Sequence, residues 1–198
     1  RGGLLREGLA FDRCQVAVVT NIGMGDHLGL NYITTLDDLA VLKRVIVQNV
    51  SPEGMAVLNA ADPTVAAMAE NCPGAVTFFA ADRHHPVMAT HRAQKQRVVY
   101  VENRRIICEQ GPTRFEFPLD AVPLTRGGTI SFQVDNAMAS VAAVWALGFD
   151  QATIARGLAS FLNDADNAPG RFNVLDYRGA TVIADYGHNP DAMLALVK

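Results

Sequence analysis

Hydrophobic positions in the first half of the chain follow two alternating patterns. Residues 16–20 read Val-Ala-Val-Val-Thr, a run typical of a strand that is buried on both faces of a parallel sheet. Over residues 35–50 the apolar positions recur at helical spacing, behind a threonine that can cap a helix. Strands at 55–58 and 75–79, with a short helix at 63–70 between them, continue the alternation. The pattern predicts an α/β fold in the doubly wound style.

In the second half of the chain the pattern changes to short strands followed by helices. Residues 97–101, 105–108 and 114–117 are strand-like runs separated by polar or turn-forming residues, and we expect them to form a small antiparallel appendage. Next comes a helix whose apolar face includes Trp145, and then a second helix at 151–161. We expect this helical pair to cover the sheet.

A polar segment at 163–170, rich in turn formers, is the best candidate for a linker. After it, residues 172–185 should form a hairpin, and Asn189-Pro190 should begin a helix. The residues that follow the linker are too few to bury a core of their own. We therefore expect a central domain at 1–166 and, at 167–198, the opening of a C-terminal α/β domain whose remainder is missing.

Composition narrows the class of protein. Apolar residues make up 49% of the chain and charged residues 19%, which excludes intrinsic disorder. The three cysteines are an odd number and form no C-x-x-C pair, so neither a disulfide framework nor a zinc site is expected, and a reducing cytoplasm is the simpler location. No apolar run approaches the ~20 residues of a membrane span. We therefore expect no contact with a membrane.

The charge balance argues against nucleic acid as a partner. The formal net charge is −3, from 17 basic and 20 acidic residues, which leaves no broad positive surface for a nucleic-acid backbone. The densest basic stretch, residues 84–105, is expected to be the solvated face of a hairpin. Any binding of phosphate groups therefore has to be local.

Two residues of the first half are candidates for chemistry. His27 lies in a glycine-flanked loop after the first expected strand, at the sheet edge where α/β folds place ligands. It is either a metal or phosphate ligand or an ordinary surface histidine. Lys43 falls on the apolar stripe of the helix at 35–50. Burial there would favour a neutral amine that can form a carbamate with carbon dioxide; alternatively, its stem covers apolar surface while the ammonium reaches water.

Four residues of the second half are further candidates. Asn136 is expected in the first turn of its helix, where it either caps the helix or meets a ligand. Arg171 is either an exposed linker residue or a clamp for phosphate. Asp185 ends an expected strand, a place that offers polar side chains to a ligand, and His188 lies in the same loop.

In sequence and in order, these motifs resemble those of the Mur ligase family of ATP-dependent amide-forming enzymes, and the match covers nearly the whole chain. The motifs are Thr20-Asn-Ile-Gly-Met-Gly-Asp-His-Leu-Gly29, a helix with Lys43, Asn59-Ala-Ala-Asp-Pro63, Asn136-Ala-Met-Ala, Pro169-Gly-Arg-Phe172 and Asp185-Tyr-Gly-His-Asn-Pro190. The resemblance implies a central sheet flanked by helices, followed by the start of the family's C-terminal domain.

The resemblance also implies a reaction. ATP would phosphorylate a carboxylate, and an amine would attack the resulting acyl phosphate to form an amide. The opening Arg-Gly-Gly-Leu-Leu and the loop around His27 look most like members that join arginine to the β-carboxylates of a polyaspartate backbone, the primer of the polymer cyanophycin. Folylpolyglutamate-type and peptidoglycan-precursor ligases stay open as alternatives. So does a related module that has lost catalysis and serves as a scaffold.

Roles for the candidate residues follow from the same resemblance. His27 matches a magnesium-binding histidine, and Lys43 matches a carbamylated lysine that helps to hold a second magnesium ion. Asn136 matches an asparagine that contacts adenine. Arg171 and Asp185 match residues that contact the nucleotide from the C-terminal domain, and we place His188 with them.

Two parts of the family's pattern are not found in residues 1–198. The Gly-x-x-Gly-Lys-Thr phosphate loop and an acidic magnesium ligand should lie before Arg1. We therefore expect a fragment that does not turn over ATP alone. Its last hairpin and helix should expose an apolar face, which would promote formation of a homo-oligomer.

Overall fold

The computed structural model describes residues 7–23, 29 and 33–197. Its main element is a six-stranded sheet with the strand order β1-β2-β3-β4-β5-β6. Four neighbouring strands pair in parallel: β1 (Cys14–Val19), β2 (Val50–Asn59), β3 (Ala75–Ala80) and β4 (Val98–Glu102). Two strands add an antiparallel edge: β5 (Arg105–Gln110) and β6 (Thr113–Pro118). The predicted α/β class is confirmed, and the antiparallel strands continue the main sheet.

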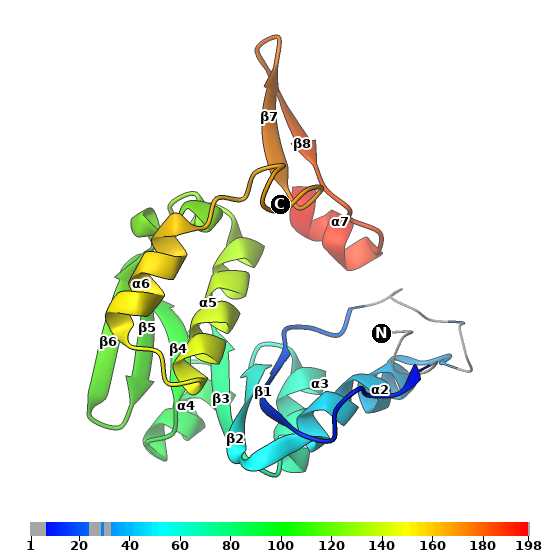
Figure 1. Ribbon diagram of the computed structural model, residues 1–198, viewed down its shortest axis with the longest axis vertical. Coiled ribbons are helices and arrows are strands. Elements are labelled where there is room, and N and C mark those ends of the chain that lie inside the picture. Colours follow the sequence, from blue (N-terminus) through cyan, green and yellow to red (C-terminus); the bar gives the residue numbers. More distant parts are fainter. Residues whose placement is uncertain (1–6, 24–28, 30–32, 198) are drawn as a thin grey trace.

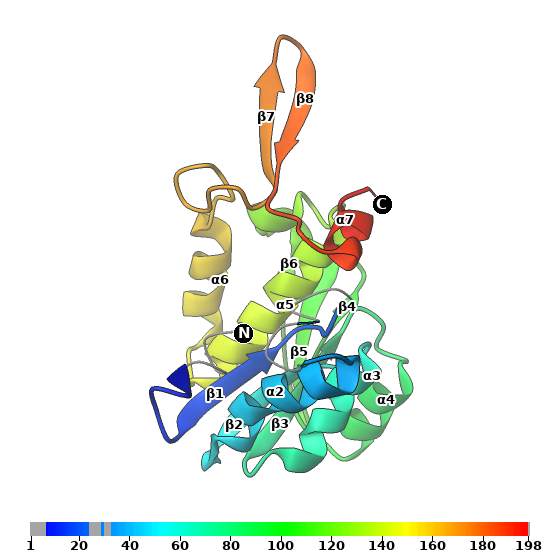
Figure 2. The ribbon, with the colours of Figure 1, turned by 90° about the vertical axis from the view of Figure 1, so that its right-hand side faces the viewer.

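The helices that connect the parallel strands all lie on one face of the sheet (Figures 1 and 2). They are α2 (Leu36–Gln48), α3 (Pro63–Ala66), which is extended by the 3-10 helix η1 (Ala67–Asn71), and α4 (Pro86–Ala93). Right-handed crossovers that step in one direction along a sheet place their helices on the same face. The order of the described strands does not reverse, so the doubly wound style predicted from the sequence is wrong for this part of the chain.

The other face of the sheet is covered by α5 (Ser131–Ala146), which packs across β1 to β4, and by α6 (Gln151–Ser160) beside it. Two short 3-10 helices, η2 (Leu119–Ala121) and η3 (Pro123–Thr125), lead from β6 to α5. Successive residues of a strand point to opposite faces. Accordingly Ala56 and Leu58 belong to the core under α2 to α4, while Val57 belongs to the core under α5 and α6. Burial on both faces explains the continuous apolar runs.

One helix was missed in the basic stretch. Residues 84–105 were expected to be the face of a hairpin, but α4 occupies Pro86–Ala93. Proline at the first helical position is a start signal, yet within this short helix only Met88 is buried. The helical period is therefore too weak to be recognised among the charged residues.

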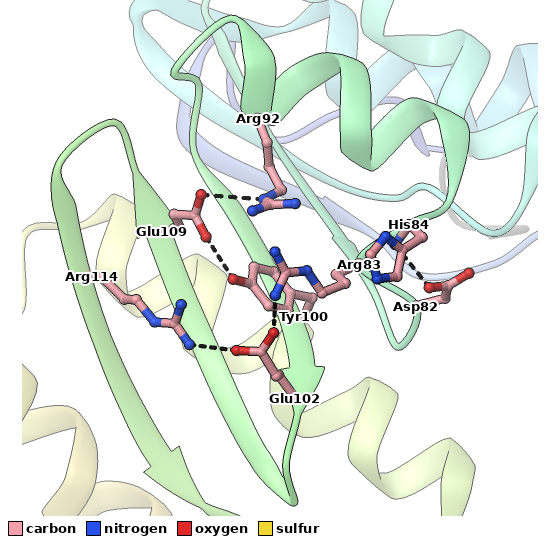
Figure 3. Close-up of polar contacts among 8 residues, drawn as sticks. All are labelled: Asp82, Arg83, His84, Arg92, Tyr100, Glu102, Glu109 and Arg114. Atoms are coloured by element: carbon pink, nitrogen blue, oxygen red, sulfur yellow. Dashed lines mark hydrogen bonds and ion pairs between the residues drawn. The ribbon is translucent and has the colours of Figure 1, made fainter.

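A cluster of charged side chains joins α4 to the antiparallel edge of the sheet (Figure 3). The buried Tyr100 donates from its hydroxyl to Glu109 Oε2 at 2.5 Å, and Arg92 Nε donates to Glu109 Oε1 at 3.2 Å. Beside them, Glu102 accepts from Arg83 and from Arg114. These arginines are paired with glutamates, so they serve to hold the sheet edge and the helix together.

Removing the Tyr100 hydroxyl with Tyr100→Phe should lower the free energy of unfolding by roughly 1.5–3 kcal/mol, since this hydrogen bond reaches a charged acceptor. Burial by itself raises the pKa of Glu109, but the hydrogen bonds from Tyr100 and Arg92 outweigh it and the pKa lies below its usual value. The stabilisation is therefore present at neutral pH and is lost as the pH falls through this lowered pKa, where Glu109 becomes protonated. Denaturant unfolding at pH 7 and at successively lower pH values should show a loss for the variant that shrinks as the pH falls; a loss that does not change with pH would contradict this account.

The end of the chain forms a hairpin, β7 (Asn173–Tyr177) and β8 (Ala180–Ala184), followed by α7 (Pro190–Val197). Both elements were predicted, and Asn189 caps α7 by accepting from the backbone N–H of Ala192 at 2.8 Å. Figure 1 shows the hairpin extending away from the main sheet. It exposes apolar residues such as Leu175 and Ile183. The domain boundary at 166/167 and self-association through this face remain predictions.

The segment expected to be a linker is a folded loop. Asn173, only 3% exposed, accepts from Gly170 N at 2.7 Å and donates to Ala168 O at 3.0 Å. Asn163 donates from its side chain to Arg171 O at 2.8 Å. These bonds fix the path of the chain from α6 into the hairpin.

The sequence predicts neither a disulfide framework nor a membrane-spanning segment. All three cysteines, Cys14, Cys72 and Cys108, are free thiols. Among residues 7–23, 29 and 33–197, we find no helix with both the length and the apolar character needed to cross a membrane.

Candidate functional site

A cleft of about 460 Å³ lies between the carboxyl ends of β1 and β2, the first turns of α5, and the end of the chain. Its volume is within the range of small-molecule sites. The lining residues come from three parts of the chain: Thr20, Asn21, Gly23 and Asn59 after the strands; Phe132, Asp135 and Asn136 on α5; Arg171, Asp185, Asn189, Asp191, Ala192, Ala195 and Leu196 at the end. This cleft is the candidate site.

Two polar side chains fix the strand side of the cleft. Asn59 donates from Nδ2 to Thr20 O at 2.9 Å, which ties the ends of β2 and β1 together. Asp62 accepts from Ile22 N at 2.8 Å through one carboxylate oxygen and caps α3 through the other. The loop after β1 is thus held at the mouth of the cleft.

On the α5 side, three residues of the cleft share one helical face. Phe132, Asp135 and Asn136 are spaced i, i+3 and i+4, which places them side by side. Asn136 was expected in the first turn, but α5 begins at Ser131, so Asn136 lies in the second turn and is not a cap. Its Nδ2 donates to Gln133 Oε1 at 3.0 Å.

Sequence reasoning did not single out Phe132 or Asp135. The residue before the helix, Ile130, makes no side-chain capping bond, so the sequence carries no clear start signal. Had the start been placed at Ser131, the helical spacing would have grouped both residues with Asn136. Burial raises the pKa of Asp135 to about 6.

The end of the chain supplies the cation of the cleft. The Arg171 guanidinium lies over the ring of Tyr186, 5.7 Å from its centroid. Phe172 donates from its backbone N–H to Asp185 Oδ2 at 2.8 Å, which holds Asp185 beside the residue that follows Arg171. The ring of Phe172 also meets the ring of Phe132 edge to face at 5.2 Å. Arg171 and Asp185 are therefore positioned together and are linked to α5.

The helix α7 approaches the loop after β1 at a glycine. A Cβ atom at Gly23 would lie 2.7 Å from Asp191 Oδ2, closer than ordinary packing allows. The absence of a side chain at this position lets the carboxylate of Asp191 reach the strand side of the cleft.

The structure brings three of the six predicted site residues into the cleft, Asn136, Arg171 and Asp185. His27 lies outside the described residues. Neither Lys43 nor His188 lines the cleft. His188 is exposed, with its ring centroid 5.3 Å from that of Tyr186. The ligand roles of all six residues remain predictions.

Lys43 does occupy the stripe that the sequence indicates. It is half-buried on α2, one helical turn from Leu39 and one from Val47, both of which are fully buried. Within the described part of the chain, no group of three His, Cys, Asp or Glu side chains is arranged to hold a metal ion. A magnesium site that uses His27 and a carbamate on Lys43 therefore remains a prediction.

The chemistry of the cleft suits a molecule with phosphates, hydroxyls and a planar ring. An arginine recognises phosphate, carboxylates and amides accept from hydroxyl and amino groups, and Phe132 offers an aromatic face. A second hollow of about 420 Å³ between α5 and α6 is lined mainly by apolar side chains. It lacks the charged groups that orient such a ligand.

Comparison with known proteins gives consistent matches along the chain. Residues 5–144 match the Mur ligase middle domain. A cyanophycin synthetase of Synechocystis sp. is 40% identical over 96% of this chain and 22% of that protein. One of Geminocystis herdmanii is 37% identical over 99% of this chain and 22% of that protein. The chain thus spans about a fifth of the length of these relatives.

Solved structures show the same fold. MurF from Acinetobacter baumannii has a TM-score of 0.63 and 22% identity over 91% of this chain and 36% of its own. MurF ligase from Thermotoga maritima, solved in complex with ADP, has a TM-score of 0.58 and 20% identity over 93% of this chain and 38% of its own. At these identities the likeness establishes the fold alone.

Proposed function

The chain belongs to the Mur ligase family, and we propose that it carries the nucleotide cleft of an ATP-dependent ligase that joins arginine to the β-carboxylates of a cyanophycin or polyaspartate primer. The observation that carries the proposal is the cleft, in which Asn136, Arg171 and Asp185 meet from separate parts of the chain. The identity to cyanophycin synthetases supports the choice of substrates. The reaction would take place in the cytoplasm.

Three polar side chains of the cleft, and His188 near it, would each have a task toward ATP. Asn136, whose amide both donates and accepts, would bind the edge of adenine. Arg171 would bind the phosphates, because guanidinium groups match phosphate oxygens in geometry and charge. Asp185 would accept from a sugar hydroxyl with the oxygen that Phe172 does not use. His188, in the same loop, would approach the nucleotide from the side of the C-terminal domain.

The magnesium ions of the reaction would be held by His27 and by Lys43 as a carbamate. Carbamate oxygens are hard anionic ligands of the kind that magnesium prefers. Bound there, magnesium supplies positive charge that offsets the charge of the phosphates. Lys43, half-buried on α2, would hold its carbamate in a fixed position, since its stem lies in line with Leu39 and Val47.

The reaction has two steps. A β-carboxylate oxygen of the primer attacks the γ-phosphorus of ATP, and ADP leaves as the acyl phosphate forms. The amine of arginine then attacks the acyl carbon; phosphate leaves, the amine loses a proton, and the amide forms. The acyl phosphate has to be kept from water between these steps. The cleft walls formed by α5 and α7 would provide this exclusion.

Release of ADP by the full-length protein that contains this chain tests the proposal. With magnesium, ATP and a polyaspartate primer, we expect release that depends on arginine and does not occur with glutamate or D-alanine as the amine. Dependence on another amine would favour a different ligase of the family, and no release with any amine would favour a scaffold. Residues 1–198 alone contain no Gly-x-x-Gly-Lys-Thr loop, so we expect no ADP from them.

A further inference from the structure

The proposed function uses only one of the three residues that α5 contributes to the cleft. Phe132 and Asp135 flank the same surface as Asn136, on one face of the helix. The edge-to-face contact with Phe172, at an interplanar angle of 78°, fixes the orientation of the Phe132 ring. The cleft therefore has an aromatic ring, a carboxylate and an amide next to one another on a rigid element.

This combination of groups suits a planar heterocycle that bears an amino group. An aromatic side chain stacks on the heterocycle or contacts its edge. An ionised carboxylate only accepts hydrogen bonds, so it favours an amino group and disfavours a carbonyl group at the same position of the ring. Asn136 has no such preference, because its amide can donate or accept. Any discrimination between amino and carbonyl groups on this wall would have to come from Asp135.

The surroundings of Asp135 strengthen such a preference. Its carboxyl is partly withdrawn from water, and burial raises its pKa to about 6. At neutral pH the group is mostly ionised, and hydrogen bonds to a poorly hydrated carboxylate are strong. A carbonyl oxygen placed directly against the ionised Asp135 would meet a second acceptor.

We propose that Asp135 is a specificity-determining residue, which accepts a hydrogen bond from the 6-amino group of adenine and rejects purines that carry a carbonyl group there. The inference rests on the proposed function, since it assumes that the cleft binds a nucleoside triphosphate. It assigns the choice of base to a residue next to Asn136.

Binding of ATP and of inosine triphosphate tests this role. Inosine triphosphate has a carbonyl group at position 6 in place of the amino group, and a hydrogen on N1, so the contact at position 6 changes from a donor to an acceptor. Calorimetry on the full-length protein without primer or arginine gives both dissociation constants. We expect the wild type to prefer ATP at least tenfold. In Asp135→Asn, whose amide can donate to a carbonyl, the ratio should fall at least fivefold, mainly through tighter binding of inosine triphosphate.

A comparator separates recognition from simple loss of charge. Asp191→Asn removes the same charge from the α7 side of the cleft and should leave the ratio of the two dissociation constants unchanged. An unchanged ratio in Asp135→Asn, with ATP still bound, would overturn the inference and leave the proposed function standing. Failure of the wild type to bind either nucleotide would overturn both.

A second measurement uses only the wild type, so it does not depend on how the variant folds. The nucleotide N6,N6-dimethyl-ATP lacks both hydrogens of the 6-amino group, and we expect it to bind at least tenfold more weakly than ATP. Equal binding of the two would contradict a hydrogen bond from this group to Asp135.

Discussion

The full-length protein with Lys43→Met should lose 10²-fold to 10³-fold of its arginine-dependent ADP release, the usual cost of removing one positioned electrostatic group. Lys43 lies between the fully buried Leu39 and Val47 on α2. Methionine keeps an unbranched stem at this position, so the free energy of unfolding should change by less than about 1.5 kcal/mol. The variant thus removes the amine that would carry the carbamate and keeps the packing of the helix.

Lys95→Met provides the matched control, because Lys95 is exposed in the turn after α4 and lies outside the cleft. It should release ADP at the rate of the wild type. A carbamate also requires carbon dioxide, so degassed buffer should slow the wild type and bicarbonate should restore it. Full activity of Lys43→Met would show that this lysine has no part in the reaction.

Arg171→Ala should weaken ATP binding about tenfold to a hundredfold, because hydrogen bonds to charged groups contribute roughly 1.5–3 kcal/mol. Arg171 is the one arginine among the described residues that line the cleft. Calorimetric titration of the full-length protein with ATP measures the effect.

Arg178→Ala is the control for this variant. The Arg178 guanidinium lies 5.2 Å from the centroid of the Tyr177 ring, a contact similar to that of Arg171 with Tyr186, but Arg178 sits in the turn between β7 and β8. Its removal should leave ATP affinity unchanged. Equal affinities of both variants and the wild type would exclude Arg171 from the nucleotide site.

The sequence predicted best those elements that carry their signals locally. The helix α2 begins where Thr35 accepts from the backbone of Asp38 at 3.1 Å, and Asp38 closes the capping box. The pairing of Asn189 with Pro190 likewise marked the start of α7. In both cases the residues that form the signal touch one another, so the sequence alone contains the information.

Features that depend on distant parts of the chain were not predicted. The one-directional order of the strands is set by how the crossovers pack. The start of α5 has no side-chain cap. From the sequence, the start of this helix was therefore placed about one turn too late, with Asn136 in the first turn, and Phe132 and Asp135 were not recognised. The order of the motifs in the sequence predicted three residues of the cleft, Asn136, Arg171 and Asp185. The fold was needed to find Asp135, the carboxylate that we propose selects the base.

Transfer of labelled oxygen from the primer to phosphate tests the central claim most directly. The primer carries oxygen-18 in its β-carboxylates, and the full-length protein is supplied with ATP, magnesium and arginine. An acyl phosphate leaves one carboxylate oxygen on the phosphate that departs, so we predict one oxygen-18 atom in each phosphate released, together with ADP. Unlabelled phosphate alongside amide formation would contradict the account, because the carboxylate would then have been activated in another way.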